Sequence, residues 1–171
     1  MTGSNIFLVG PMGAGKSTIG KRLAKALNRP FYDTDKEIES RTGVKIAWIF
    51  EREGEAGFRL REQKVLKALS EKTGVVIATG GGIVLSEVNR QYLMERGQVI
   101  YLSASCEQLL KRTSKDKNRP LLLTDDPKKT IIKLLAERAP LYRAVADIEL
   151  MTGTRSIQQT VSNLVKQLHK E

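Results

Sequence analysis

Gly10-Pro11-Met12-Gly13-Ala14-Gly15-Lys16-Ser17 is the stretch from which the fold of this chain can be predicted. It has the spacing G-x-x-x-x-G-K-[ST], and it lies between an apolar run at residues 6–9 and a segment with helical periodicity. That spacing is typical of a P-loop, in which glycines let backbone N–H groups curl around a polyphosphate at the start of a helix. We therefore expect a nucleoside triphosphate to bind here.

The motif also predicts the roles of two side chains. Lys16 is expected to reach the β- and γ-phosphates, and Ser17 to offer its hydroxyl to Mg²⁺. The alternative is a glycine-rich turn that only packs between a strand and a helix. It is disfavoured because strand, loop, Lys-Ser pair and helix all agree. The motif does not identify the group that accepts the phosphate.

Length and composition set the class of protein. A chain of 171 residues suits one domain, and its content of 40% hydrophobic and 28% charged residues is that of a globular protein. No apolar run approaches the roughly 20 residues of a membrane span, and residues 2–5 lack the basic segment of an export signal. Cys106 is the only cysteine, so no intrachain disulfide can form. We expect a cytoplasmic monomer that does not bind membranes.

The net charge of +10 is compatible with two kinds of partner. It could indicate nucleic acid, but an enzyme that binds ATP and a second anion also needs positive potential. Aromatic residues make up 5% of the chain and do not interleave with the basic ones, which disfavours a stacking surface for single strands. We therefore expect no nucleic-acid partner.

Apolar periodicity and turn residues divide the chain into alternating strands and helices. Strands are predicted at residues 6–9, 31–33, 75–79, 99–102 and 146–150. Helices are predicted at 16–28, at 34–42 with a capping box of Thr34 and Glu37, and at 45–53 and 55–72, broken at Gly54. Further helices are predicted from the cap Ser86 to Gly97, at 106–113, at 127–138 ended by Pro140, and from the cap Ser156 onward. The polar, basic run at 114–120 is expected to be a mobile loop. This alternation indicates a parallel sheet covered by helices on both faces.

Ligands of parallel sheets bind beyond the carboxyl ends of the strands, where this chain has polar residues and glycines. Neither the strand at 75–79 nor the one at 99–102 ends in Asp or Glu, so Asp33 is the best candidate to bind Mg²⁺ through a water molecule. Asp35 could then orient or deprotonate an acceptor hydroxyl. Alternatively, both carboxylates only stabilise the N-terminus of the helix that follows.

Three arginines are candidates for binding anions, although each by itself could be an ordinary surface residue. Arg59 has Glu62 three positions later, which could be a helix surface pair. Arg138 lies just before Pro140. Arg119 precedes Pro120 in the basic loop and resembles an arm that closes over phosphates.

Several motifs, taken together in chain order, resemble those of one enzyme family. They are Gly-Pro-Met-Gly-Ala-Gly-Lys-Ser-Thr at 10–18, Phe-Tyr-Asp-Thr-Asp at 31–35, Gly57-Phe58-Arg59 with Glu62, Ala-Thr-Gly-Gly-Gly at 78–82, Arg119-Pro120-Leu121-Leu122, and Arg138 with Pro140-Leu141-Tyr142. This set resembles a bacterial shikimate kinase over nearly the whole chain. The P-loop is generic, but the ordered set is specific.

The resemblance implies an α/β fold of the nucleoside-monophosphate-kinase type, with three α-β-α layers around a five-stranded parallel sheet of order 2-3-1-4-5. It implies transfer of the ATP γ-phosphate to the 3-hydroxyl of shikimate, a step of aromatic amino acid biosynthesis, with ATP and Mg²⁺ required. A single P-loop kinase domain would span residues 1–171, with a substrate-binding segment at about 34–62 and a lid at about 113–126.

The resemblance also implies the residues of the site. Shikimate would be bound by Asp35, Arg59, Gly81 and Arg138. ATP would be bound by Gly13, Ala14, Gly15, Lys16, Ser17 and Thr18, by Arg119 of the lid, and by Arg155 beside the adenine. Mg²⁺ would be held by Ser17 and, through water, by Asp33. The catalytic residues would be Lys16, Asp35 and Arg119.

The chemistry of shikimate agrees with this assignment. Its carboxylate needs cationic donors, which Arg59 and Arg138 can supply, and its hydroxyls need an acceptor such as Asp35. Glycines at 80–82 let the backbone approach the ring without an intervening side chain. Aromatic residues at 48, 50 and 58 could form apolar walls, although core packing would explain them equally well.

Two other functions remain to be weighed against this one. Another small-metabolite kinase, such as a gluconate kinase, would share the P-loop and the second strand, but the Arg59 motif and the glycine triplet argue against it. A nucleic-acid-binding ATPase would fit the charge, but the later strands lack a terminal acidic residue.

Overall fold

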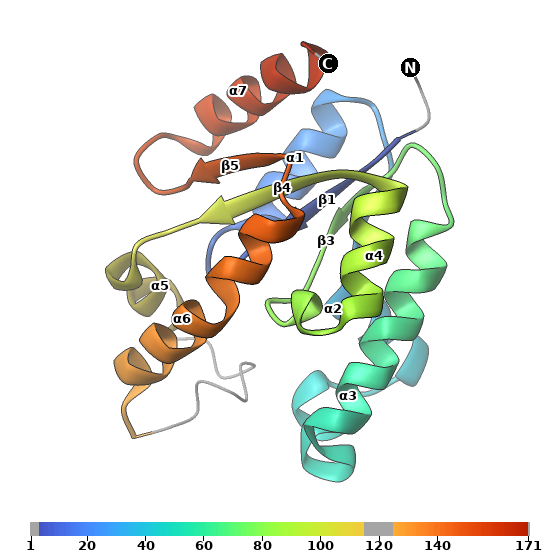
Figure 1. Ribbon diagram of the computed structural model, residues 1–171, viewed down its shortest axis with the longest axis vertical. Helices are drawn as coiled ribbons and strands as arrows, with labels where there is room; N and C mark the ends of the chain where they lie inside the picture. Colours follow the sequence, from blue (N-terminus) through green and yellow to red (C-terminus); the bar gives the residue numbers. More distant parts are fainter. Residues whose placement is uncertain (1–3, 115–124, 171) are drawn as a thin grey trace.

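The computed structural model describes residues 4–114 and 125–170, and its core is a parallel sheet of five strands in the order β2-β3-β1-β4-β5 (Figure 1). The strands are β1 (Asn5–Val9), β2 (Phe31–Asp33), β3 (Val76–Ala78), β4 (Gly97–Ser103) and β5 (Ile148–Met151). The helices are α1 (Lys16–Ala26), α2 (Thr34–Thr42), α3 (Ile46–Ser70), α4 (Glu87–Arg96), α5 (Cys106–Thr113), α6 (Pro127–Val145) and α7 (Ile157–His169), with a short 3₁₀ helix η1 (Ile83–Leu85). The predicted fold class and strand order are confirmed.

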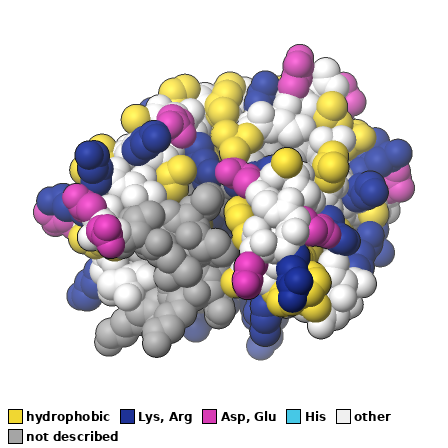
Figure 2. Space-filling model, turned by 90° about the horizontal axis from the view of Figure 1, so that it is seen from below, with side chains coloured by type: hydrophobic (Ala, Val, Ile, Leu, Met, Phe, Trp, Pro, Cys, Tyr) yellow, Lys and Arg dark blue, Asp and Glu magenta, His cyan; other side chains and the backbone are white. Residues whose placement is uncertain are grey.

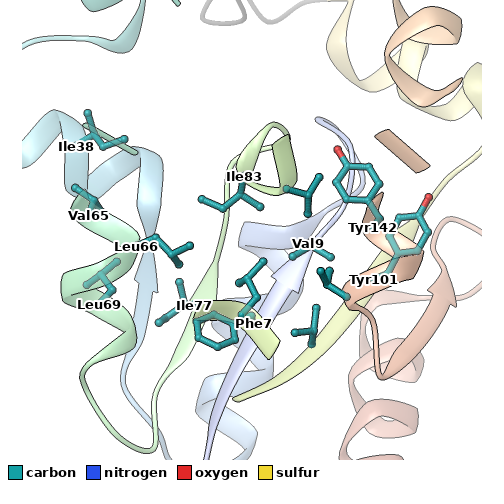
Figure 3. Packing of buried hydrophobic residues seen from close by; sticks show 14 of the residues in the cluster. Phe7, Val9, Ile38, Val65, Leu66, Leu69, Ile77, Ile83, Tyr101 and Tyr142 are labelled. Atoms are coloured by element: carbon teal, nitrogen blue, oxygen red, sulfur yellow. The ribbon is translucent and has the colours of Figure 1, made fainter. Parts of the chain in front are cut away.

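Helices cover both faces of the sheet because β1 is apolar on both sides. Phe7 and Val9 point to the face covered by α3, α4 and α6, where Leu66 and Tyr142 complete a buried cluster (Figures 1 and 3). Ile6 and Leu8 point to the opposite face, which α1 and α7 cover. Such two-sided burial is typical of a central parallel strand. It accounts for the uninterrupted apolar run before the P-loop.

The parallel register brings three strand ends to one edge of the sheet. Leu8 of β1 pairs with Ala78 of β3, and Asp33 of β2 pairs with the same residue. The segments that follow these strands are the P-loop, the start of α2 and the glycines at 80–82. They therefore lie next to one another, as expected for a parallel sheet.

The start of α2 differs from the prediction. Asp33, not Thr34, is the N-cap residue, because its Oδ1 accepts from the N–H groups of Asp35 at 2.9 Å and Lys36 at 3.2 Å. The predicted capping box of Thr34 and Glu37 is therefore wrong. The hydroxyl of Thr34 instead accepts from Gly80 N–H at 3.0 Å. Gly80 lies in the turn after β3, 46 residues away, so no local pattern could indicate this partner.

The end of α6 also differs from the prediction. The helix does not stop before Pro140 but continues to Val145. A proline inside a helix costs about 3 kcal/mol. The turns beyond it bury Tyr142 and Val145 in the core, and each large buried side chain contributes about 1.5–3 kcal/mol. Tertiary packing therefore offsets the cost of the proline.

The break predicted at Gly54 is confirmed. The segment α3 is interrupted there by a residue with φ 72° and ψ −179°, a conformation that favours glycine. Arg61, in the second half of the segment, forms an ion pair with Glu53 across the break at 2.6 Å. The kink turns the second half so that Phe58 and Glu62 face the sheet and are buried.

Candidate active site

The P-loop has the conformation that its glycines allow. Gly13 and Gly15 have φ values of 84° and 94°, in the left-handed region that other residues rarely adopt. Gly15 is the N-cap of α1 and supplies no side chain, so the first N–H groups of this helix face the loop. A helix start of this kind attracts phosphate through its N–H groups and its dipole.

Lys16 is largely buried at the base of this loop. Its Nζ donates to the carbonyl oxygens of Gly10 at 2.6 Å and Pro11 at 2.9 Å. These contacts hold the ammonium group under the loop rather than in solvent. It is therefore close to the place where a bound polyphosphate would carry its charge.

Ser17 and Asp33 form a pair of oxygen ligands beside the loop. Ser17 Oγ donates to Asp33 Oδ2 at 2.5 Å, while the other carboxylate oxygen of Asp33 caps α2. The capping of α2 by Asp33 is therefore observed, and it uses only one of the two carboxylate oxygens. Within the described residues no group of three His, Cys, Asp or Glu side chains could hold a metal. Mg²⁺ usually takes only one or two protein oxygens together with water and phosphates, so the pair fits this ion.

Four charged side chains lie around the glycines at 80–82, at the neighbouring part of the sheet edge: Asp35, Arg59, Glu62 and Arg138. Arg59 pairs with Glu62 at 3.0 Å and with Glu55 at 3.1 Å, and the Glu62 side chain is only 1% exposed. Arg138, from α6, is 5% exposed. Three of their buried polar atoms, Arg59 Nε, Arg138 Nε and Glu62 Oε2, have no hydrogen-bond partner among the described residues. Buried polar atoms are usually paired, so these can serve a polar ligand.

The glycines allow these side chains to crowd against the backbone. A methyl group on Gly80 would lie 2.8 Å from Glu62 Oε2 and 2.9 Å from Asp35 Oδ1, and one on Gly82 would lie 2.5 Å from Arg59 Nη2. On Gly81 it would lie 3.5 Å from Arg138 Nη1 and 3.4 Å from Met12 of the P-loop. Asp35, Arg59, Gly81 and Arg138, which come from four separate segments, therefore meet at one place.

A cavity of about 360 Å³ is lined by Asp35 and Gly81 but not by Arg59 or Arg138. Its lining includes Gly13 and residues 15–18 of the P-loop, Asp33 and Asp35, and residues 79–81. The P-loop, the pair of oxygen ligands and Asp35 thus share one cavity, and the arginines adjoin it through their contacts with Gly81 and Gly82. This arrangement can bring a phosphate donor and an acceptor together.

Burial raises the pKa of Glu62 to about 7. The Arg59 guanidinium beside it lowers this pKa, whereas the negative charge of Asp35 raises it further. The folded protein therefore binds a proton at Glu62 more tightly than the unfolded chain does. The contribution of this group to the free energy of unfolding accordingly falls as pH rises from about 4.5 to about 7.

The variant Glu62→Gln should remove this dependence on pH. We expect the difference in Tm, wild type minus variant, to decrease as pH rises from 5 to 8. Thermal unfolding of both proteins across that range measures it. Glu55→Gln, which removes the exposed partner of the same arginine, is the matched control and should follow the wild-type curve in parallel. Parallel curves for wild type and Glu62→Gln would contradict the raised pKa.

Arg112 lies at the site but was not among the residues expected from the sequence. Its Nη1 donates to Gly13 O at 2.8 Å, and its side chain lies between the main cavity and a second hollow of about 230 Å³. In the sequence it is one of two basic residues in the last turn of α5, where a cation is expected for the helix dipole alone. No local signal separates it from its neighbour Lys111.

The remaining residues that were candidates from the sequence lie in different parts of the structure. Arg155 lines the second hollow together with Gly15 and Thr18, so it lies beside the P-loop. Phe58 is a core residue that packs on Phe50 at 4.7 Å between ring centroids, whereas Trp48 is 46% exposed. Arg119 and most of the predicted lid lie outside the described residues.

The family model named Shikimate kinase matches residues 12–169. The chain belongs to the shikimate kinase family. Shikimate kinase of Pseudomonas fluorescens is 56% identical over 164 residues, which are 96% of this chain and 95% of that protein. Shikimate kinase 1 of Yersinia pestis is 51% identical over 165 residues, with the same coverage of each chain.

Solved structures of shikimate kinases have the same fold. Shikimate kinase from Acinetobacter baumannii in complex with shikimate has a TM-score of 0.96 and 46% identity, with 98% of this chain and 93% of that chain covered. The enzyme from Aquifex aeolicus has a TM-score of 0.84 and 40% identity, with 96% of each chain covered. The family predicted from the sequence motifs is therefore confirmed. None of the helices described in this shikimate kinase family member is long and apolar enough to cross a membrane.

Proposed function

We propose that this protein is a shikimate kinase that transfers the γ-phosphate of ATP to the 3-hydroxyl of shikimate, giving shikimate 3-phosphate and ADP for aromatic amino acid biosynthesis. The observation that carries the proposal is the position of Gly81. It lies between Met12 of the P-loop and Arg138. Asp35 lies next to Gly80, and Arg59 lies next to Gly82. A phosphate donor and a hydroxylated carboxylic acid can therefore bind side by side.

This geometry supports a separate role for each charged residue. Arg59 and Arg138 bind the carboxylate of shikimate, since guanidinium groups donate paired hydrogen bonds to carboxylates. Asp35 accepts the proton of the 3-hydroxyl as that oxygen forms its bond to the γ-phosphorus. The bond between the γ-phosphorus and the bridging oxygen of ADP breaks, and Lys16 stabilises the negative charge that develops on the phosphates. We assign residues 34–62 as the segment that carries Asp35 and Arg59 to the substrate.

We further propose that Ser17 and Asp33 hold Mg²⁺, Ser17 directly and Asp33 through water. Bound there, the ion would neutralise phosphate charge during transfer. Asp33 Oδ2 faces Ser17 Oγ, whereas Oδ1 is occupied by the backbone of α2. The two residues can therefore act as a metal site without any loss of the helix cap.

ADP release in the presence of alternative acceptors tests the proposed function. Purified protein is incubated with ATP and Mg²⁺ alone, or with shikimate, gluconate, single-stranded DNA or RNA. We expect only shikimate to stimulate turnover, with shikimate 3-phosphate identified by mass spectrometry. Stimulation by gluconate or nucleic acid, without a response to shikimate, would refute the proposal. On the face seen in Figure 2, basic side chains are interspersed with acidic and hydrophobic ones, so the coloured part of this face has no continuous basic surface for a nucleic acid.

Asp33→Asn tests the proposed metal site. An asparagine keeps the oxygen that caps α2, so the fold should be retained. Loss of the charge that faces Ser17 should raise the Mg²⁺ concentration for half-maximal activity by about tenfold or more. Activity titrated against Mg²⁺ measures the change. Asp35→Asn is the control, and its residual activity should reach half its maximum at the wild-type Mg²⁺ concentration. The same half-maximal concentration in all three proteins would exclude a separate metal role for Asp33.

A further inference from the structure

The glycine turn at residues 80–82 is held by a hydrogen bond at each of three successive peptide units. Gly80 N–H donates to Thr34 Oγ1 at 3.0 Å, and Gly80 O accepts from Ile83 N–H at 3.1 Å. Gly81 O accepts from the hydroxyl of Tyr142 at 2.5 Å. In a planar trans peptide the C=O and N–H point in opposite directions. The two held carbonyls therefore also set the directions of the Gly81 and Gly82 N–H groups.

Thr34 connects this turn to the segment that carries the acidic residues of the site. It is fully buried and lies directly between Asp33 and Asp35. Its hydroxyl does not cap α2, because Asp33 performs that task. A buried hydroxyl is costly unless it is bonded, and this one accepts from Gly80 N–H. The bond therefore fixes the distance between the turn and the backbone of Asp35.

Tyr142 connects the same turn to the helix that carries Arg138. It follows Arg138 by four residues, so the two side chains lie on one face of α6. Its ring is fully buried and stacks on Tyr101 at 5.0 Å between centroids, and Figure 3 shows it between the turn that carries Ile83 and Tyr101. Burial raises the pKa of Tyr142, although the Arg138 guanidinium opposes this change. The hydroxyl thus keeps its proton and remains a donor to Gly81 O.

The turn is in close contact with the charged side chains on either side of it. Gly80 lies against Asp35 and Glu62, whereas Gly81 lies between Arg138 and Met12. A methyl group would not fit at Gly80, and at Gly81 it would be in van der Waals contact with both neighbours. A small shift of the turn would therefore displace several groups of the subsite together. Geometry of this kind must be held within about 0.5 Å for binding or catalysis.

We propose that Thr34 and Tyr142 are positioning residues, which clamp the turn at 80–82 from opposite sides and thereby set the places of Asp35 and Arg138 for the acceptor. The inference rests on the proposed function, because it concerns the acceptor subsite of that reaction. It assigns neither residue a contact with the reacting atoms. Their loss should disturb the binding of shikimate and leave the nucleotide subsite unchanged.

Removal of single hydroxyl groups tests the clamp. Tyr142→Phe and Thr34→Val each delete one bond with little change in volume, and we expect each to raise the KM for shikimate about tenfold with the KM for ATP within about twofold of wild type. Thr34→Ser keeps the hydroxyl and should restore the wild-type KM. Tyr101→Phe is the matched control, because it removes a hydroxyl from the stacked partner of Tyr142 without touching the turn. Circular dichroism and Tm establish that each variant is folded.

The outcomes separate this inference from the proposed function. If wild-type protein does not phosphorylate shikimate, the proposed function fails. If it does, an unchanged KM for shikimate in the folded variants overturns the clamp. Equal increases in both KM values, or the same increase in Tyr101→Phe, would also overturn it, because they indicate general loosening of the core. If Tyr142→Phe does not fold, the comparison of Thr34→Val with Thr34→Ser decides.

Discussion

Lys16→Ala is expected to lower kcat about a hundredfold or more while the protein remains folded. The ammonium group lies at the base of the P-loop, 2.6 Å from Gly10 O, where a bound polyphosphate would carry its charge. Removal of a single preorganised charge that stabilises a transition state typically costs about 10²–10³ in kcat. The change should appear in kcat rather than only in KM, because the charge on the phosphates increases as transfer proceeds.

Steady-state kinetics with both substrates saturating measures this loss. Lys21→Ala is the matched control, because it deletes the same side chain from an exposed position of the same helix. It should retain the wild-type kcat. Circular dichroism and Tm show whether Lys16→Ala is folded, since the variant also leaves two loop carbonyls without their donor. A folded Lys16→Ala protein with nearly normal kcat would refute the role of this lysine.

Asp35→Asn should lower kcat by about a hundredfold, since general bases contribute about 10²–10⁴ to the rate. The amide keeps the shape of the side chain next to Gly80 but cannot accept the proton of the acceptor hydroxyl. The KM for ATP should stay near its wild-type value, because the side chain lies on the acceptor side of the cavity, beside Glu62 and the glycine turn.

Product formation at saturating shikimate, followed across a range of ATP concentrations, tests this expectation. Glu37→Gln provides the control, because it neutralises a carboxylate of the same helix that pairs with Arg41 rather than facing the glycine turn. It should leave both kcat and KM unchanged. A wild-type kcat in Asp35→Asn would mean that the carboxylate neither orients nor deprotonates the acceptor, and its role would then be limited to binding.

Local sequence patterns predicted most elements of the fold. The break at Gly54, the caps at Ser86 and Ser156 and the limits of β2 and α5 all agree with the structure. These features depend on a few neighbouring residues, through backbone preference, side-chain caps and apolar periodicity. The P-loop belongs to the same class, because its conformation follows from its own glycines. The ordered motifs also indicated the family correctly.

The tertiary structure alone decided which groups meet. The hydroxyl of Thr34 does not cap α2 but accepts from Gly80 N–H in the turn after β3. Helix α6 continues through Pro140 because Tyr142 and Val145 are buried beyond it. Arg112 acquires its place beside Gly13 only when α5 packs against the P-loop. Contacts between residues distant in sequence depend on the register of the sheet and on the packing of the helices. Such contacts determine whether an arginine is a surface cation or part of a binding site. The sequence by itself therefore determined the P-loop, the succession of strands and helices and the family, whereas packing decided the partners of each polar side chain.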